Sequence, residues 1–284
     1  MKLGVALGRL NPAFFAEVTR AADRLGYESV WLPEHLVFPV TMTRSPYPGQ
    51  EHPPVPPNTP VFDAFAYLSY LAGLTGGVKL ATHVYNLALR HPFVAARAVQ
   101  TLDVVSGGRA LVGVGAGWLE SEWQAAGLDF HSRGRRFDEA IVVCRRLWTE
   151  DVVEHHGEFF DFNPVMFEPK PVQHPAPPVL VGGESVAALK RAARLGDGWV
   201  GMNSESPEAV AAKVRQLNEW RAEAGRAELP FEVCVGGDVA GPEDLERWES
   251  AGVHRLILAP WSRSREAVSG LERLARVVGL EPRS

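Results

Sequence analysis

Residues that could carry acid–base chemistry follow two apolar, strand-like runs of this chain, at the points where those runs end. Glu34 and His35 follow the second run, and Thr82, His83 and Val84 end the third. A histidine titrates near neutral pH, and a carboxylate can accept hydrogen bonds from a ligand. We therefore predict a ligand site here, with His35 as the proton donor or acceptor. The alternatives are a solvated loop at the first place and a histidine that caps backbone carbonyls at the second.

Glycines interrupt the run from Arg109 to Trp123, RALVGVGAGWLESEW, where a buried strand ends. Gly115 and Gly117 lack side chains, so a flat ligand could lie against the backbone there. The spacing is G-x-G-x-G, and Trp118 stands where the dinucleotide-binding pattern needs a glycine. We therefore expect a barrel strand that ends at a flat cofactor.

A second glycine pair follows the strand-like run VLV in the segment VLVGGES. Gly182 and Gly183 precede Glu184, and Ser185 opens a helix. Exposed N–H groups at a helix N-terminus favour an anion, so we predict a cofactor-phosphate site that includes Glu184. The alternative is a tight turn capped by Ser185, and the charge of Glu184 would oppose a phosphate unless the carboxylate points away.

The chain lacks the usual motifs of enzymes that supply their own nucleophile or metal. It has no G-x-x-x-x-G-K-[ST], G-x-S-x-G, C-x-x-C or H-E-x-x-H. His155 and His156 are adjacent, and neighbours on a strand point to opposite faces, which disfavours joint metal binding. We expect no metal site and infer that a bound cofactor supplies the chemistry.

Composition narrows the partners further. The formal net charge is −5, and 46% of the residues are hydrophobic, which argues against nucleic-acid binding and for a globular protein. No apolar run approaches the length of a membrane span, so we expect no membrane partner and a cytoplasmic location. Cys144 and Cys234 are predicted to be free core residues.

Eight apolar runs, each followed by a helical pattern, predict the elements that position these residues. The expected strands are Leu3–Leu7, Ser29–Leu32, Val78–Val84, Ala110–Val114, Val179–Val181, Trp199–Met202, Phe231–Val235 and Arg255–Ala259. The expected helices are Phe14–Leu25, Phe62–Leu74, Phe93–Val105, Phe137–Trp148, Ser185–Leu195, Pro207–Ala224, Pro242–Ala251 and Ser264–Val278. This count predicts an α/β fold, a single (β/α)8 TIM-barrel domain over residues 1–284. An open doubly wound sheet is the alternative.

Two insertions interrupt the repeat, one after strand two and one before strand five. Pro39–Pro60 is rich in proline, and Asp151–Pro178 has the pattern of a β-hairpin. Long loops in compact domains are often functional, so we expect both segments to act as lids over the site.

The segments WLPEH, HVYNLALRHPFVAARAVQTLDVVSGGRALVGVGAGW and VLVGGES together resemble the bacterial luciferase-like oxidoreductase superfamily. The resemblance covers nearly the whole chain and is closest to the branch that uses the deazaflavin coenzyme F420. It implies a ring bound in the barrel mouth, Glu34 and His35 at the positions of a conserved acid–histidine pair, and a non-prolyl cis peptide between His83 and Val84 that supports the ring. Gly182 and Gly183 match the loop near the cofactor phosphate.

The sequence also departs from the sugar-phosphate dehydrogenases of that branch. Pro39 stands where they have an aromatic residue, and Trp118 stands where they have a glutamate. Ser121 replaces an asparagine that contacts the coenzyme, so we assign it to the cofactor site by position alone. Their substrate is therefore not transferred to this chain.

The resulting hypothesis is a coenzyme F420-dependent oxidoreductase that transfers a hydride between the deazaflavin and a small organic substrate. A second hypothesis is an FMN-dependent luciferase-like monooxygenase, which would use oxygen and a flavin reductase partner. A third is a barrel that binds a cofactor without turnover. The resemblance also implies a homodimer, which is an argument by analogy alone.

Overall fold

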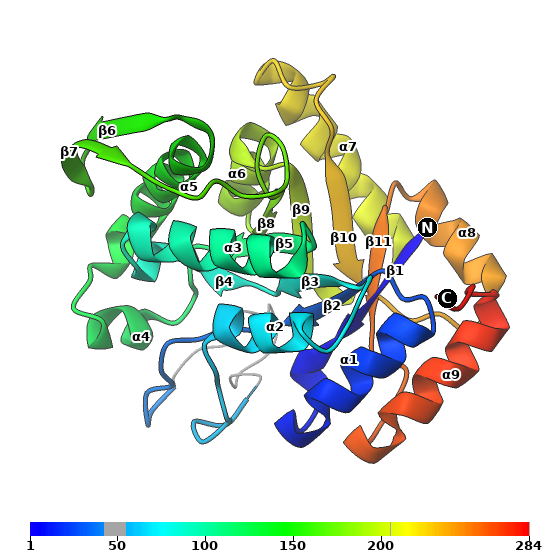
Figure 1. Cartoon of the computed structure of the whole chain (residues 1–284). Coiled ribbons are helices and arrows are strands. Elements are labelled where there is room, and N and C mark those ends of the chain that lie inside the picture. The colour runs from blue at the N-terminus through cyan, green and yellow to red at the C-terminus, as the bar shows by residue number, and fades with distance from the viewer. Residues whose placement is uncertain (43–54, 205, 284) are drawn as a thin grey trace.

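Eight parallel strands form a closed barrel at the centre of the molecule (Figure 1). The computed structural model describes residues 1–42, 55–204 and 206–283. Around the ring the strands are β1 (Lys2–Ala6), β2 (Ser29–Leu32), β3 (Lys79–Thr82), β5 (Ala110–Gly115), β8 (Val179–Gly182), β9 (Gly198–Ser204), β10 (Glu232–Gly236) and β11 (Arg255–Leu258). Pairing of Leu3 with Leu256, and of Leu80 with Ala110, closes the ring. The (β/α)8 prediction is confirmed, and the open sheet is excluded.

Helices surround the barrel, and each predicted helix is present within a few residues of its expected bounds. They are α1 (Phe15–Arg24), α2 (Ala64–Ala72), α3 (Pro92–Ser106), α5 (Arg133–Thr149), α6 (Val186–Leu195), α7 (Pro207–Glu223), α8 (Pro242–Ser250) and α9 (Ala267–Val278), with a short α4 (Glu120–Ala125) before α5. Among the described residues, no helix has the length and apolar character to cross a membrane.

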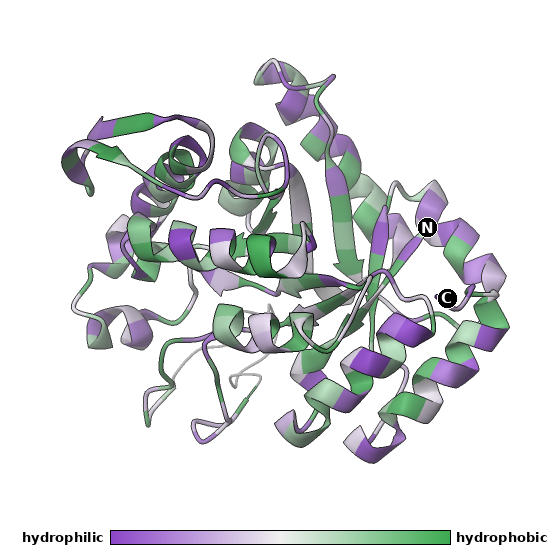
Figure 2. Cartoon of the chain, in the orientation of Figure 1, coloured by the Kyte–Doolittle hydropathy of each residue, from purple (hydrophilic) through white to green (hydrophobic). Residues whose placement is uncertain are grey.

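The helices pack on the barrel through apolar faces at helical spacing. In α1, Phe15, Val18, Ala21 and Ala22 are buried, as their spacing predicts. Figure 2 shows the resulting mixture of hydrophobic and hydrophilic residues along the outer helices. Inside the ring, a separate cluster of side chains fills the barrel: Trp31, Ala81, Leu111, Leu180, Val200, Cys234 and Ile257. The barrel is therefore a packed core and not a channel.

A buried ionic network closes the N-terminal end of the barrel, where the strands begin. The Arg255 side chain is fully buried and donates to Glu28 Oε2 at 2.7 Å and to Glu232 Oε2 at 2.6 Å. Lys79 Nζ lies 3.4 Å from Glu28 Oε1, and Lys2 pairs with Glu232. Burial alone would raise the pKa of Glu28, but the hydrogen bonds and charge of Arg255 lower it to about 2. Both carboxylates are thus compensated.

The insertion before the fifth barrel strand forms the predicted hairpin, β6 (Val152–His156) and β7 (Asp161–Met166), but not the predicted lid. It follows the C-terminus of α5, and Figure 1 shows it beside that helix. Glu139 on α5 accepts from His155 Nε2 at 2.9 Å and from the backbone of the hairpin turn. The Phe162 ring lies 4.7 Å from the ring of Phe93 on α3. The hairpin therefore packs against the outer side of α5 and contacts α3 at Phe93.

The other expected lid, Pro39–Pro60, lies partly outside the described residues, which omit 43–54. Val40, inside this insertion, exposes 91% of its surface. Val61 and Phe62, which directly follow the insertion, expose 36% and 41%. The described ends of this insertion are therefore apolar and accessible.

Candidate active site at the C-terminal ends of the barrel strands

The C-terminal ends of the barrel strands, called the mouth below, carry most of the predicted site residues. Strand ends of a parallel barrel meet at one face, so residues far apart in sequence become neighbours there. Val84 reaches the glycines at the ends of β5 and β8, and His35 reaches Glu122 on α4. The structure thus joins the ends of β2, β3, β5 and β8 at one site.

A bulge after β3 is the central feature of the mouth. The His83–Val84 peptide bond is cis, as the resemblance predicted, and the chain then forms the short strand β4 (Tyr85–Asn86), which pairs with β5. The Val84 side chain lies over two glycines: a Cβ on Gly115 would be 2.7 Å from Val84 Cγ2, and a Cβ on Gly182 would be 2.7 Å from Val84 Cγ1. The bulge therefore presents an apolar support at the mouth.

These contacts show what occupies the space beside the glycines. Val84 fills the space that a Cβ on Gly115 or Gly182 would take, and a Cβ on Gly117, where φ is +77°, would be 2.7 Å from Trp123 Nε1. The glycines therefore leave room for neighbouring side chains of the chain itself. Contact between a cofactor and the backbone of Gly115, Gly117 or Gly182 stays a prediction.

His83 holds an unsatisfied polar atom in the mouth. Its Nε2 is buried and has no hydrogen-bond partner among the described residues, and its ring stands edge-on to Trp31 at 5.8 Å. Burial lowers the pKa of His83 to about 4, so the imidazole is neutral at physiological pH. Buried polar atoms usually have partners, and a ligand in the mouth is a candidate partner for Nε2.

Thr82 does not form the predicted ligand wall. Its side chain is fully buried, and its hydroxyl donates to the carbonyl oxygen of Gly113 on β5 at 2.7 Å. The hydroxyl thus links β3 to β5 and is not accessible to a ligand.

Glu34 is held in a buried ion pair. Its side chain has no exposed surface, and Arg90 Nη2 donates to its Oε1 at 2.6 Å. Its Oε2 accepts from the backbone N–H of Asn86 at 2.9 Å. The Arg90 guanidinium also lies 4.3 Å from the centroid of the Tyr85 ring. Direct cofactor contact by Glu34 stays a prediction; the structure shows it fixing the chain after β2 to β4.

His35 lies at the rim of the mouth and is oriented by a second buried carboxylate. Its Nδ1 is 3.0 Å from Oε2 of Glu122, and the His35 side chain is 16% exposed while that of Glu122 is fully buried. The rings of Phe38 and Trp118 lie 4.5 Å and 6.0 Å from the imidazole. Among the described residues no hydrogen bond occupies Nε2. This nitrogen can therefore exchange a proton with a ligand.

The predicted phosphate loop after β8 has a compensated charge. Glu184 pairs with Lys213 on α7, and the lysine charge offsets the repulsion that the carboxylate would exert on an anion. Gly183 has φ +121°, and Ser185 caps α6 by accepting from the Ala188 N–H at 3.2 Å. The loop is both the capped turn and a candidate anion site, so a phosphate there stays a prediction.

Ser121 lies on α4, partly exposed, next to Glu122. The structure adds no contact that supports its predicted part in cofactor binding, which stays a prediction from its position.

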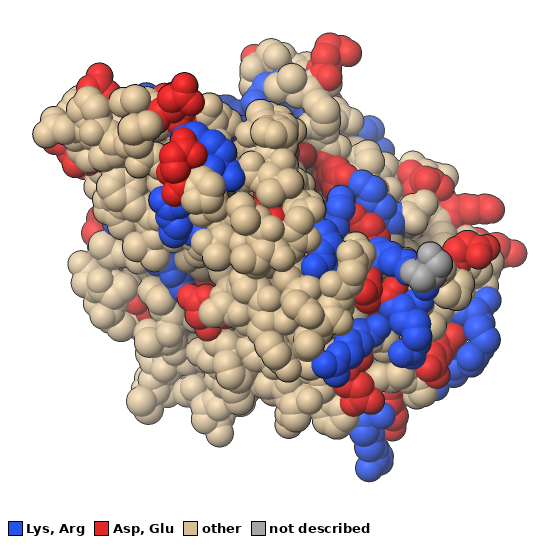
Figure 3. Space-filling model, viewed as in Figure 1, with Lys and Arg blue, Asp and Glu red and all other residues tan. Residues whose placement is uncertain are grey.

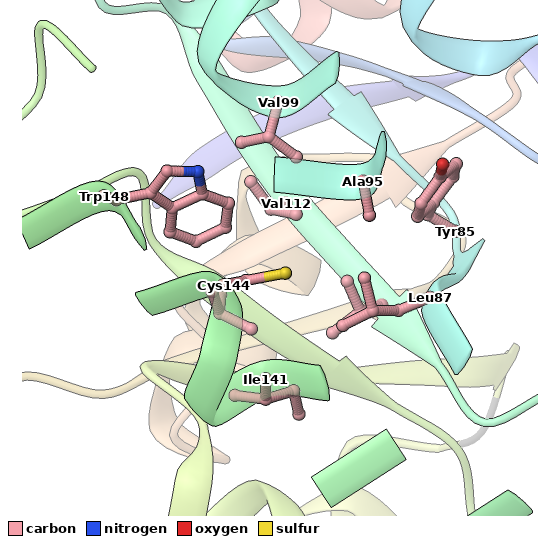
Figure 4. Close-up of a pocket in the computed structure, with 10 residues that line it drawn as sticks. Tyr85, Leu87, Ala95, Val99, Val112, Ile141, Cys144 and Trp148 are labelled. Atoms are coloured by element: carbon pink, nitrogen blue, oxygen red, sulfur yellow. The ribbon is translucent and has the colours of Figure 1, made fainter. Parts of the chain in front are cut away.

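An apolar cavity lies outside the mouth, between β5 and the helices α3 and α5 (Figure 4). Its walls include Tyr85, Val99, Val112, Ile141, Cys144 and Trp148.

Burial raises the pKa of the Cys144 thiol to about 12, so this thiol is not an activated nucleophile. Both cysteines are free and buried, as predicted. Among the described residues no group of three or more His, Cys, Asp or Glu could hold a metal ion.

Sequence reasoning missed the partners of the two acid–base residues. Arg90 pairs with Glu34 across 56 positions, and Glu122 pairs with His35 across 87. A single arginine in the apolar segment HVYNLALRHP was a usable signal for Arg90. Glu122 is one of two glutamates in the segment LESEW, and its spacing did not distinguish it from Glu120.

The site fits a planar cofactor with an anionic group. Val84 offers an apolar support, His83 Nε2 is a buried polar atom without a partner, and the loop at Gly183 precedes a helix N-terminus.

Comparison with known proteins places the chain in a family. The model of the luciferase-like monooxygenase family matches residues 3–279. An uncharacterized protein of Mycobacterium tuberculosis is 33% identical over 264 residues, 92% of each chain. The FMNH(2)-dependent dimethylsulfone monooxygenase of Pseudomonas putida is 37% identical over 139 residues, 48% of this chain and 38% of the relative.

Solved structures with the same fold include enzymes that use a deazaflavin. An F420-dependent secondary alcohol dehydrogenase in complex with an F420–acetone adduct aligns with a TM-score of 0.78 and 18% identity, over 98% of both chains. The coenzyme F420-dependent tetrahydromethanopterin reductase of Methanopyrus kandleri aligns with a TM-score of 0.77 and 16% identity, over 99% of both chains. Because the family model spans almost the whole chain, this protein belongs to the luciferase-like monooxygenase family.

Proposed function

We propose that this protein is a coenzyme F420-dependent oxidoreductase that transfers a hydride between the deazaflavin ring and a small, neutral organic substrate. The observation that carries the proposal is His35, held at the rim by a buried carboxylate with its Nε2 available. Reduction of a carbonyl needs one hydride and one proton, and His35 can supply the proton. The F420-dependent structural neighbours support the choice of cofactor.

Each part of the mouth has a task in this proposal. The bound deazaflavin would supply two electrons as a hydride. Val84 would support the ring, His83 Nε2 would exchange a hydrogen bond with a polar ring atom, and the loop at Gly183 would hold the phosphate. His35 would hold the proton at Nε2, next to the substrate oxygen. Orientation and exclusion of water would account for much of the acceleration.

The rim favours an uncharged, apolar substrate. Leu36 and Val37 are 38% and 46% exposed, and Phe38 and Trp118 flank His35. The carboxylate of Glu34 nearby is already paired with Arg90. A charged substrate would lose its hydration at such a rim without gaining an opposite charge.

A second candidate is an FMN-dependent monooxygenase, favoured by the 37% identity to the Pseudomonas putida enzyme across 48% of this chain. Reduced flavin reacts with oxygen, so this activity would need oxygen and a flavin reductase as partner. A third candidate, a barrel that binds a cofactor without turnover, predicts no effect of His35 on any reaction.

Turnover assays without oxygen and in air distinguish these candidates. The protein is mixed with reduced F420 and a panel of neutral ketones and aldehydes without oxygen, and with reduced FMN and the same panel in air. We expect oxidation of F420 in the anaerobic arm, lost in His35→Ala. Product formation only with reduced FMN and oxygen would establish the monooxygenase, and no turnover in either arm would contradict both enzymatic proposals.

We also propose a homodimer, with a second copy covering the face formed by α2 and α3. Figure 3 shows that face as mostly uncharged, and α2 has no charged residue. Tyr70, Val94 and Val105 expose 55%, 59% and 56% of their surface there. Light scattering should give twice the chain mass for the wild type and a monomer for Tyr70→Glu with Val105→Asp. A wild-type monomer would contradict the proposal.

A further inference from the structure

Glu122 links two segments of the mouth that are distant in the sequence. It lies on α4, after β5, and its side chain has no exposed surface. One oxygen, Oε2, faces His35 Nδ1 at 3.0 Å. The other, Oε1, accepts from the backbone N–H groups of Leu36 at 2.6 Å and Val37 at 3.4 Å. One carboxylate therefore holds both the imidazole and the backbone that carries it.

The two buried carboxylates of the mouth differ in their partners. Glu34 is paired with the guanidinium of Arg90, which carries a permanent charge. The partner of Glu122 in an ion pair is His35, whose charge depends on protonation. A carboxylate only accepts hydrogen bonds, so the proton in the His35–Glu122 contact belongs to Nδ1. Glu122 thereby selects one of the two tautomers of the neutral ring.

We propose that Glu122 is a positioning residue that fixes the Nδ1–H tautomer of His35 and keeps Nε2 as the atom that exchanges the proton. The catalytic part of this inference rests on the proposed hydride transfer, whereas the tautomer itself does not. Glu122 has no exposed surface and therefore acts through His35 and not on the substrate. The orienting carboxylate of other histidine-dependent enzymes acts in the same way.

The proton balance follows from this tautomer. In the reducing direction, bound reduced F420 would supply the hydride that forms the new C–H bond at the carbonyl carbon as the C=O π bond breaks. The substrate oxygen takes the proton from Nε2 of the imidazolium, which leaves neutral His35 with its proton on Nδ1. Solvent then returns a proton to Nε2. In the oxidising direction, Nε2 accepts the hydroxyl proton, and bound oxidised F420 would take up the hydride that leaves the substrate carbon.

The substitution Glu122→Gln should invert the tautomer preference of His35 while residue 122 keeps its hydrogen bonds to His35, Leu36 and Val37. The amide has one accepting oxygen and one donating NH2 group. The N–H groups of Leu36 and Val37 require the oxygen, so the NH2 group must face His35 Nδ1. Nδ1 must then accept, and the ring proton moves to Nε2. Glu120→Gln, on the same helix without a contact to His35, is the matched control.

Nitrogen NMR of 15N-histidine-labelled protein without cofactor reads the tautomer directly, and His35→Ala assigns the signals. At alkaline pH, where imidazoles are neutral, we expect Nδ1–H in the wild type and in Glu120→Gln, and Nε2–H in Glu122→Gln. A wild-type ring protonated on Nε2, or an unchanged tautomer in Glu122→Gln, would overturn the proposal. If Glu122→Gln fails to fold, the wild-type spectrum decides alone.

Steady-state kinetics with F420 test the catalytic consequence. Glu122→Gln should lower kcat on the order of 100-fold or more with little change in KM, because substrate binding is retained and the proton is misplaced. Glu120→Gln should behave as the wild type. An unchanged kcat in Glu122→Gln would overturn the positioning role. Absence of wild-type turnover with F420 would instead contradict the proposed function, and the NMR result would still judge the tautomer.

Discussion

The two ends of the barrel differ in how completely their buried polar groups are paired. At the N-terminal end, Arg255 satisfies Glu28 and Glu232 in a closed network. At the mouth, His83 Nε2 is buried without a partner among the described residues, and His35 is partly exposed. The network at the N-terminal end is satisfied by its own side chains, whereas the mouth has polar groups to which a ligand could hydrogen-bond. The difference supports our proposal that polar side chains stabilise the first end and serve binding and catalysis at the second.

The largest expected effect is on turnover, at the mouth. His35→Ala should lower kcat by roughly 10²–10⁴-fold, because a positioned general acid contributes about that much. Cofactor affinity should change little, whereas the melting temperature should fall, because the variant leaves Oε2 of the buried Glu122 without its partner. His156→Ala, an exposed histidine of the hairpin, is the control. Wild-type turnover in His35→Ala would contradict the role of His35 as the proton donor at the mouth.

The next largest effect is on stability, at the opposite end. Arg255→Met leaves the partly buried Glu28 and Glu232 with weaker partners, and breaking a buried pair costs about 3–5 kcal/mol, which is an upper bound for these partly exposed carboxylates. Urea unfolding should show this loss with cofactor affinity retained. Arg135→Met, which removes the exposed pair with Glu158, should change stability little. An equal loss in both variants would contradict a special role for the closed end.

A pH series sharpens the comparison at His83. Its pKa is about 4 in the folded protein and 6.5 in the unfolded chain, so the unfolded chain binds more protons between these values. The contribution of neutral His83 to the free energy of unfolding is therefore fully present above pH 6.5. It falls by about 3 kcal/mol as the pH drops to 4. His83→Gln should lack this component of the acid loss. Parallel pH curves for the two proteins would show that His83 is not held neutral by burial.

The smallest effect concerns the support at the bulge. Gly182→Ala places a Cβ 2.7 Å from Val84 Cγ1, which should cost about 1–3 kcal/mol and weaken cofactor binding by displacing Val84. Gly241→Ala meets no atom within 4 Å and is the control. Calorimetry of unfolding and a cofactor titration measure both effects. Identical affinity in the two variants would argue against contact between Val84 and the cofactor.

Local patterns were sufficient to predict the repeating elements of the fold. Runs such as Ala110–Val114 are apolar because both faces of a parallel strand are buried, and the spacing in Phe14–Leu25 is that of one helix face. The cis peptide before Val84 followed from the resemblance and not from local pattern.

The errors concern contacts between distant residues. The glycines at 115 and 182 were correctly interpreted as places of close approach, but the pattern did not show that Val84 is the neighbour. The hairpin was predicted as a lid, yet Glu139 and Phe93 hold it on the outer helices. Glu122 was missed because its pairing with His35 depends on how β2 and β5 are placed in the barrel.

Equilibrium titration of the protein with F420 and, separately, with FMN tests the central claim most directly. Ligand fluorescence in matched buffer reports both affinities without any assumption about the substrate. The account predicts micromolar or tighter binding of F420 and much weaker binding of FMN. Preferential binding of FMN would contradict the deazaflavin-dependent function, and binding of neither would contradict the assignment of the mouth as a cofactor site.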